Sequence, residues 1–143
     1  MKKETITAIL CEGKIVGQHA KHEISPVQIE FPQKAGPTNA FAHLLKLSPS
    51  NLGRYEGVEV HGKQYVLYFD KADSLSHHVI ATYPLRTCDG EIFHIVAGSV
   101  IVAKEDENRH ALDISKAEQT LIAEYLDEQV VLAGLSVLFG KDC

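Results

Sequence analysis

Three turn signals that contain glycine, each set between apolar segments, constrain the fold of this chain more than any other feature. Glycine accepts the positive φ angle that a tight two-residue turn requires, and such turns join antiparallel strands. The signals therefore predict three β-hairpins. The turns are Cys11-Glu12-Gly13-Lys14, Val60-His61-Gly62-Lys63 and Cys88-Asp89-Gly90-Glu91. The strands that they would join are Thr5–Cys11 with Lys14–His19, Val58–Val60 with Lys63–Phe69, and Val79–Thr87 with Ile92–Ala103.

The apolar pattern changes to a helical period after the third hairpin. Ser115 and Glu118 have the spacing of a capping box, and the apolar residues of 121–126 then fall on one helical face. We therefore predict a helix that begins near Ser115. The apolar segment 130–139 could continue this helix, with Gly134 as a weak point, or form a final strand, because it contains several valines. We favour the helix.

A shorter helix is predicted over residues 40–46, in the first half of the chain. Thr38 would cap it, and Ser48-Pro49 would end it. A short strand, Val27–Phe31, comes before it between two prolines.

Hairpins that come first and a long helix that comes last predict an α+β fold. We expect an antiparallel sheet or small open barrel built from three hairpins, with one short helix and a long C-terminal helix packed on one face. The chain has 143 residues, 45% hydrophobic and 23% charged, which is typical of one globular domain. No linker rich in Pro, Gly or Ser interrupts it, so we predict a single domain over residues 1–143.

The third hairpin is apolar on both of its faces. A two-residue turn at Asp89-Gly90 would place Arg86 opposite Phe93, and neither face is then clearly polar. The helix would cover one face; the rest of a curled sheet, a second subunit or a ligand would cover the other. We predict a homodimer, the commonest soluble oligomer. The candidate interface residues are Val79, Val96, Val100 and Val102.

Charge and cysteine content bear on partners and location. The formal net charge is −5, whereas a nucleic-acid binder needs a basic face, so we expect no nucleic acid. The longest uncharged apolar stretches are far shorter than the roughly 20 residues of a membrane span, so we expect no membrane. The three cysteines are widely separated, which favours free thiols and a cytoplasmic location. The acidic run Glu105-Asp106-Glu107 is interpreted as a solvated loop.

No catalytic or cofactor motif is found, and the function prediction follows from that. We expect a binding or interaction module with an apolar pocket or a partner surface. The alternative is a small enzyme that uses histidine and carboxylate acid–base chemistry on a small molecule. The candidate ligand-binding residues are Tyr83, Arg86 and His94 at one end of the third hairpin, with Tyr65 and Tyr68 on the second.

Histidines are numerous, with 8 in the chain. His19 and His22, together with His77 or His78, are the best candidates for a metal site, but no spacing fixes them relative to one another. We therefore expect no metal and no cofactor.

Overall fold

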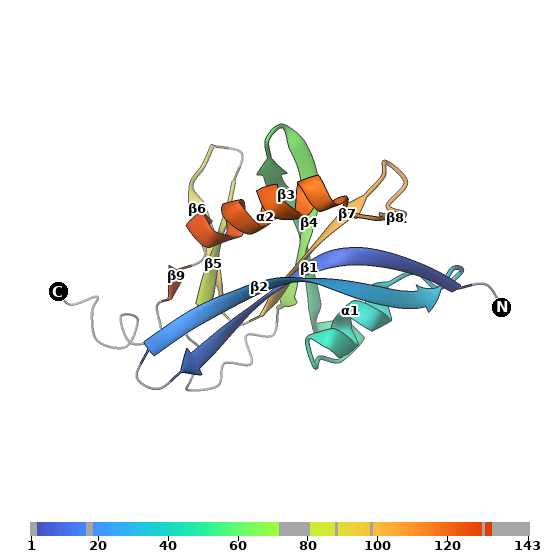
Figure 1. Cartoon of the computed structure of the whole chain (residues 1–143), viewed down its shortest axis with the longest axis horizontal. Coiled ribbons are helices and arrows are strands. Elements are labelled where there is room, and N and C mark those ends of the chain that lie inside the picture. The colour runs from blue at the N-terminus through green and yellow to red at the C-terminus, as the bar shows by residue number, and fades with distance from the viewer. Residues whose placement is uncertain are drawn as a thin grey trace.

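The computed structural model describes residues 3–16, 19–71, 81–87, 89–97, 99–129 and 131–132. These residues form an antiparallel α+β fold (Figure 1), which confirms the predicted fold class. In chain order the elements are β1 (Lys3–Val16), β2 (His19–Pro32), α1 (Thr38–Leu44), the short 3-10 helix η1 (Pro49–Asn51), β3 (Leu52–Val60), β4 (Lys63–Asp70), β5 (Ala81–Arg86), β6 (Ile92–Ala97), β7 (Val100–Glu105), β8 (Ala111–Leu112), α2 (Lys116–Gln129) and β9 (Val131–Leu132).

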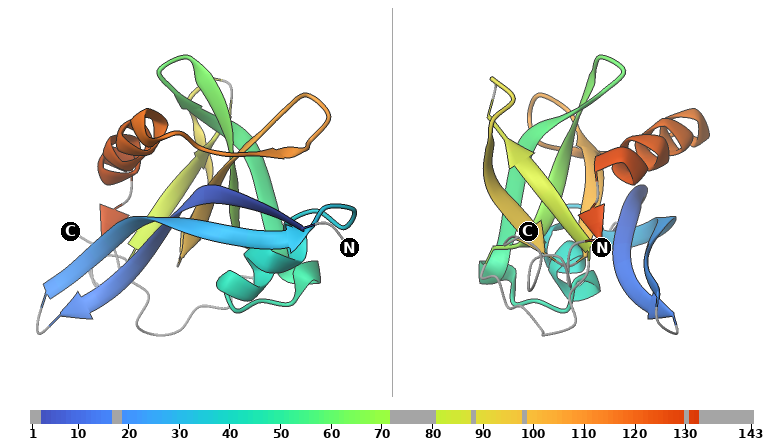
Figure 2. Two further views of the ribbon diagram at one scale, coloured as in Figure 1. Left: turned by 45° about the vertical axis from the view of Figure 1, so that its right-hand side comes forward. Right: turned by 90° about the vertical axis from the view of Figure 1, so that its left-hand side faces the viewer.

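The described strands are arranged in two antiparallel sheets. The main sheet has the order β2-β1-β7-β4-β3, with β8 as a further partner of β7, and the smaller one has the order β6-β5-β9. The main sheet is open, with β2 and β3 at its two edges. The smaller sheet lies against β3 and β4 (Figure 2).

The centre of the main sheet is buried on both faces. Alternate residues of β7 point into two different apolar clusters, as the two-residue period of a strand requires. Ile122 and Leu126 of α2 and Leu85 of β5 complete the first cluster. Phe41 of α1 belongs to the second. The double cover that we expected for this apolar segment therefore comes from the chain itself.

Helix α2 begins as the capping box predicts. Glu118 N donates to Ser115 Oγ at 3.2 Å, and Ser115 N donates to Glu118 Oε1 at 3.1 Å. The predicted continuation of this helix is wrong at Val131 and Leu132, which form β9 and pair with Thr82 and Ala81 of β5. The backbone groups of Val131 and Leu132 pair with the free edge of β5. If the helix continued instead, these edge groups of β5 would lack this partner. Residues 133–139 lie outside the described residues.

Helix α1 begins earlier than predicted, and Thr38 lies inside it. Pro37 is its N-cap and makes no side-chain capping bond. The Pro37 carbonyl accepts the first helical bond, from Phe41 N at 2.9 Å. The prediction that Thr38 caps this helix is therefore wrong.

The first hairpin has a different turn from the predicted one. β1 runs on through Glu12-Gly13, and its pairing with β2 extends from Lys3 opposite Pro32 to Val16 opposite His19. The predicted pairing of Thr5–Cys11 with Lys14–His19 is therefore wrong, and the predicted strand Val27–Phe31 is the end of β2. The observed register places Ile6 opposite Ile29 and leaves them only 4% and 5% exposed. This burial outweighs the local turn signal at Glu12-Gly13.

The second hairpin has its turn where predicted. His61 and Gly62 have φ angles of 50° and 81°, as a two-residue turn with positive φ at both positions requires. Val60 lies opposite Lys63 across this turn.

The third hairpin is correct in part. The predicted register holds from Thr82 opposite Ala97 to Leu85 opposite His94, and a bulge then pairs Arg86 with Ile92 instead of Phe93. Beyond Ala97 the prediction is wrong, because β7 leaves β5 and pairs with β1 and β4. The centre of the main sheet is where a strand that is apolar on both faces can be fully buried.

In the part of the chain that the structure describes, neither helix has the length and apolar character needed to cross a membrane.

Candidate functional site

The main sheet splits where β1 separates from β7. The two strands pair only from Ile9 to Cys11 of β1, and further along β7 the short strand β8 takes its place. Ile114 N donates to Thr7 O at 3.3 Å, and Thr7 N donates to Asp113 Oδ1 at 2.6 Å. The segment after β8, Asp113 and Ile114, thus lies between β7 and the first half of β1 and is hydrogen-bonded to Thr7. Figure 2 shows the β7–β8 turn standing away from the N-terminal end of β1 and from the chain that leads into α1.

A pocket of about 410 Å³ lies in this split, and we call it the fork hollow. Its volume is within the range of small-molecule sites. One wall is apolar, and Leu112, which is 37% exposed, is part of it. The lining residues come from four separate segments: Glu4; Phe31 and Gln33; Gly36 and Pro37; and Arg109, His110, Ala111 and Leu112.

The β7–β8 turn supplies the charged side of the fork hollow. Asp106 N donates to His110 O and Arg109 N donates to Asp106 O, both at 3.0 Å. Asp106 Oδ1 accepts from the backbone N–H of Asn108 at 2.8 Å and of His110 at 2.9 Å. The bond from the His110 backbone, with that from Asn108, lowers the pKa of Asp106. The turn is therefore held by its own hydrogen bonds, and it presents Arg109 with a φ of 64°.

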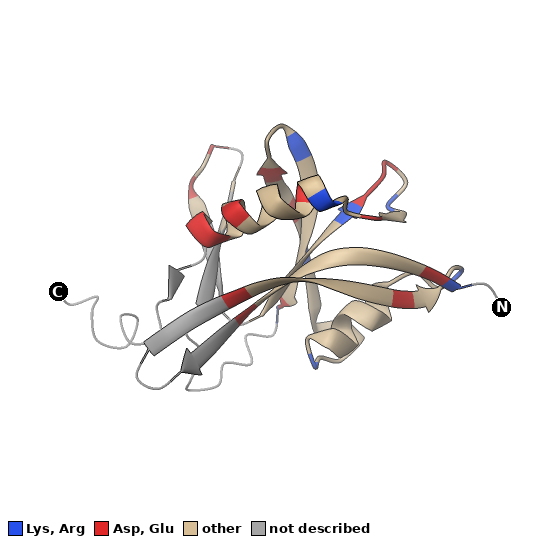
Figure 3. Ribbon diagram, in the orientation of Figure 1, with Lys and Arg blue, Asp and Glu red and all other residues tan. Residues whose placement is uncertain are grey.

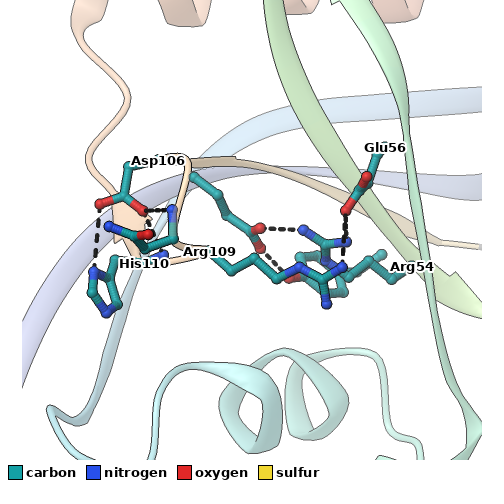
Figure 4. Close-up of polar contacts among 8 residues, drawn as sticks. Arg54, Glu56, Asp106, Arg109 and His110 are labelled. Carbon is teal, nitrogen blue, oxygen red and sulfur yellow. Dashed lines mark hydrogen bonds and ion pairs between the residues drawn. The ribbon is translucent and has the colours of Figure 1, made fainter.

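Arg109 extends from this turn toward Glu56 on β3 (Figure 4), and its Nη2 lies 3.7 Å from Glu56 Oε2. Glu56 also pairs with Arg54, which binds Glu105 as well. The Tyr68 hydroxyl donates to Glu105. Although burial opposes its charge, the hydrogen bonds that Arg54 donates to Glu105 and Glu56 raise the pKa of Arg54. The hydrogen bond from Arg54 lowers the pKa of Glu56.

A second pocket, the charged hollow, lies over this network and has a volume of about 340 Å³. Figure 3 shows acidic and basic residues side by side at the β7–β8 turn. Arg109 lines both pockets and thus stands between them. The lining residues of the charged hollow are Arg54, Glu56, Gln64, Tyr65, Val66, Glu105, Asp106, Glu107 and Arg109.

Glu118 is the buried carboxylate of a separate cluster on the α2 side of the sheet. It accepts from Tyr65 Oη at 2.7 Å, and its Oε2 lies 2.9 Å from Lys104 Nζ. Burial opposes its ionisation, but hydrogen bonds from Lys104, Tyr65 and Ser115 prevail and lower the pKa of Glu118 to about 2. Burial, followed by the bond to Glu118, raises the pKa of Tyr65. These groups satisfy one another inside the protein.

The predicted ligand-binding tyrosines of the second hairpin lie in the core. Tyr65 is 2% and Tyr68 is 6% exposed, and each hydroxyl is bound to a carboxylate. Tyr65 and Tyr68 lie on opposite faces of β4, so the structure does not bring them together. Burial, followed by the bond to Glu105, raises the pKa of Tyr68. Both phenols therefore keep their protons at neutral pH.

The structure describes the side chains of only some of the other predicted site residues. Val100 and Val102 have 1% and 0% of their surface exposed and are packed by the chain's own core, so neither offers a side chain to a partner. The side chains of Tyr83, Arg86, His94 and Val96, and the whole of Val79, lie outside what the structure describes. Backbone register places His94 opposite Leu85 and Tyr83 opposite Val96.

The described residues hold one histidine–carboxylate pair, in which His110 Nδ1 lies 3.4 Å from Asp106 Oδ2, but they support neither a metal site nor a reactive cysteine. Among them there is no group of three or more metal-binding side chains. The side chains of His19 and His22 lie outside the described part, as do His77 and His78. Burial, followed by repulsion from Glu12 and Asp127, raises the pKa of the Cys11 thiol to about 12, so this cysteine is inert at neutral pH.

Of the residues that line the two hollows, sequence reasoning named only Tyr65 as a candidate and missed the others. Glu105 was expected in a solvated loop, but its side chain is 8% exposed because Arg54 and Tyr68 bind it. The Asp106 spacing to Asn108 and His110 is typical of a turn and was a usable signal. The left-handed conformation of Arg109 has no signal in the sequence.

Comparison with models of known protein families, with curated proteins and with solved structures gives no match. The function is therefore argued from the site.

Proposed function

We propose that this protein is a binding module and that the fork hollow receives a small amphipathic molecule. The observation that carries the proposal is the composition of this pocket. Leu112, Phe31 and Pro37 give it an apolar wall, while Glu4 and Arg109 give it charges at its rim. Apolar walls with a few polar groups are the usual design of small-molecule sites.

The exposure of Leu112 supports the proposal. Ile92 and Leu112 are the two exposed large hydrophobic residues among those that the structure describes, at 50% and 37%. Ile92 does not line either hollow, whereas Leu112 lines the fork hollow. An apolar ligand on Leu112 would remove this surface from water, which is favourable by about 25 cal/mol per Å².

The test uses phenylacetamide, a neutral molecule with an aromatic ring and a polar end. Saturation-transfer NMR should detect its binding to the wild-type chain, with a dissociation constant on the order of 1 mM, as expected for about ten heavy atoms. The Leu112→Asp variant should lose the signal because a carboxylate would occupy the apolar wall. Ile92→Asp is the matched control, since it makes the same change at the other exposed hydrophobic residue.

Equal loss in both variants, or no loss in Leu112→Asp, would contradict the proposal. Circular dichroism spectra of the variants would show that each has kept its fold.

The homodimer and the cytoplasmic location stay predictions. Val100 and Val102 are covered by the chain itself, so only Val79 and Val96 remain as candidate residues of a dimer interface. The enzyme alternative also stays a prediction, because the side chains of Tyr83, Arg86 and His94, on which it depends, lie outside the described residues.

A further inference from the structure

We propose that the ligand of the fork hollow is a carboxylate and that Arg109 binds it by exchanging Glu56 for the ligand. This inference rests on the proposed function and names the class of molecule that the site takes.

Arg109 is held loosely where it is. Its guanidinium lies 3.7 Å from one Glu56 oxygen, and its side chain is 73% exposed. Arg54, by contrast, binds both Glu56 and Glu105, and its side chain is 25% exposed. The two arginines therefore have different roles. Arg54 holds two carboxylates of the protein in place, whereas Arg109 has N–H donors available for a ligand.

Arg109 is placed to make the exchange. It lines the charged hollow, where Glu56 lies, and also the fork hollow. A rotation of its side chain about the fixed β7–β8 turn would therefore carry the guanidinium from one pocket to the other. Glu56 would stay paired through Arg54, so the exchange leaves no carboxylate without a partner.

The charges of the fork hollow select the ligand's class and its orientation. Arg109 is its permanent cation, and a guanidinium binds a carboxylate through two parallel hydrogen bonds. Glu4 is the one carboxylate among the lining residues, and it repels a second negative charge. A ligand would therefore place its carboxylate at Arg109 and its apolar part on the wall formed by Phe31, Pro37 and Leu112.

The experiment compares phenylacetate with phenylacetamide, which have the same size and differ in charge. In the wild-type chain, NMR titration should give phenylacetate about fivefold higher affinity than the amide. Arg109→Gln should remove this preference, so that phenylacetate binds no more tightly than the amide. Glu56→Gln should increase the preference, because it frees Arg109 from its competing carboxylate. Lys63→Gln, at the exposed start of β4, is the control for loss of a positive charge elsewhere.

The outcomes separate this inference from the proposed function. If both probes bind equally, or if Arg109→Gln keeps the preference, the carboxylate inference is wrong and the binding pocket stands. If neither probe binds the wild-type chain, both are wrong. A preference that falls as much in Lys63→Gln as in Arg109→Gln would also overturn the inference, because it would show a general effect of charge.

Discussion

At the scale of single residues, the carboxylate of Glu118 has two structural tasks. One oxygen completes the capping box of α2, and the other accepts from Tyr65 and pairs with Lys104. These partners come from the start of the helix, from β4 and from β7, so one side chain ties three elements together. A carboxylate that is 6% exposed is tolerated only because each of its oxygens is satisfied.

Replacing Glu118 should therefore cost stability. Glu118→Gln removes the ion pair with Lys104 and weakens the cap, which we expect to lower the free energy of unfolding by about 1–2 kcal/mol. Urea denaturation at neutral pH measures this loss. Glu124→Gln, on the exposed side of the same helix, should change stability far less.

Acid should act through the same residue. The pKa of Glu118 is lowered to about 2 from 4.5, so its carboxylate stabilises the folded state fully above pH 4.5. That contribution is lost as the pH falls toward 2, since the proton then binds the unfolded chain first. The difference in stability between wild type and Glu118→Gln should therefore shrink from pH 5 to pH 3. A difference that stays constant over this range would contradict the assignment.

At the scale of elements, the β7–β8 turn holds Arg109 in a left-handed backbone conformation that lowers the stability of the fold. A non-glycine residue at a φ of 64° is strained. Arg109→Gly should thus raise the free energy of unfolding by up to about 1 kcal/mol while removing the preference for phenylacetate. His61→Gly makes the same relief of strain in the β3–β4 turn, where φ is 50°. It should stabilise the protein and leave phenylacetate binding intact; a loss of binding there would count against the account.

Strand β7 depends on burial on both of its faces. Val100→Asp would place a carboxylate in the cluster formed with α2 and β5, and we expect it to lower stability by more than about 4 kcal/mol and to unfold the chain. Val100→Ala should cost about 2 kcal/mol and leave a folded protein. Thermal unfolding followed by circular dichroism distinguishes the two. A folded Val100→Asp variant that merely changes its oligomeric state would show that Val100 lies at an interface instead.

At the scale of the whole molecule, local signals predicted the elements better than their arrangement. The His61-Gly62 turn and the Ser115–Glu118 capping box were confirmed because neighbouring residues alone determine them. The Glu12-Gly13 turn was wrong because pairing of Ile6 with Ile29, distant in the sequence, decides that register.

The fork hollow could not be predicted for the same reason. Glu4, Phe31 and Arg109 meet only because β1 separates from β7 and β8 takes its place. No short motif records such a split in a sheet. Pocket residues that come from distant segments can be found only once strand order is known.

Native mass spectrometry of the untagged chain measures its oligomeric state and detects any ligand that it retains. The predicted homodimer has the mass of two chains of 15.8 kDa each, with a small organic ligand retained on a fraction of the molecules. A homodimer would confirm the sequence-based prediction, and a monomer at all concentrations would contradict it.

The most direct test of the central claim is to map where a ligand binds. Phenylacetate is titrated into the ¹⁵N-labelled chain, and the shifts of the backbone amides are followed. We predict that the largest shifts fall on the lining of the fork hollow, above all on Phe31, Gly36, Arg109 and Leu112, and that amides of β5 and β6 stay in place. Shifts that instead gather on β5 and β6, with the fork hollow unchanged, would contradict the account.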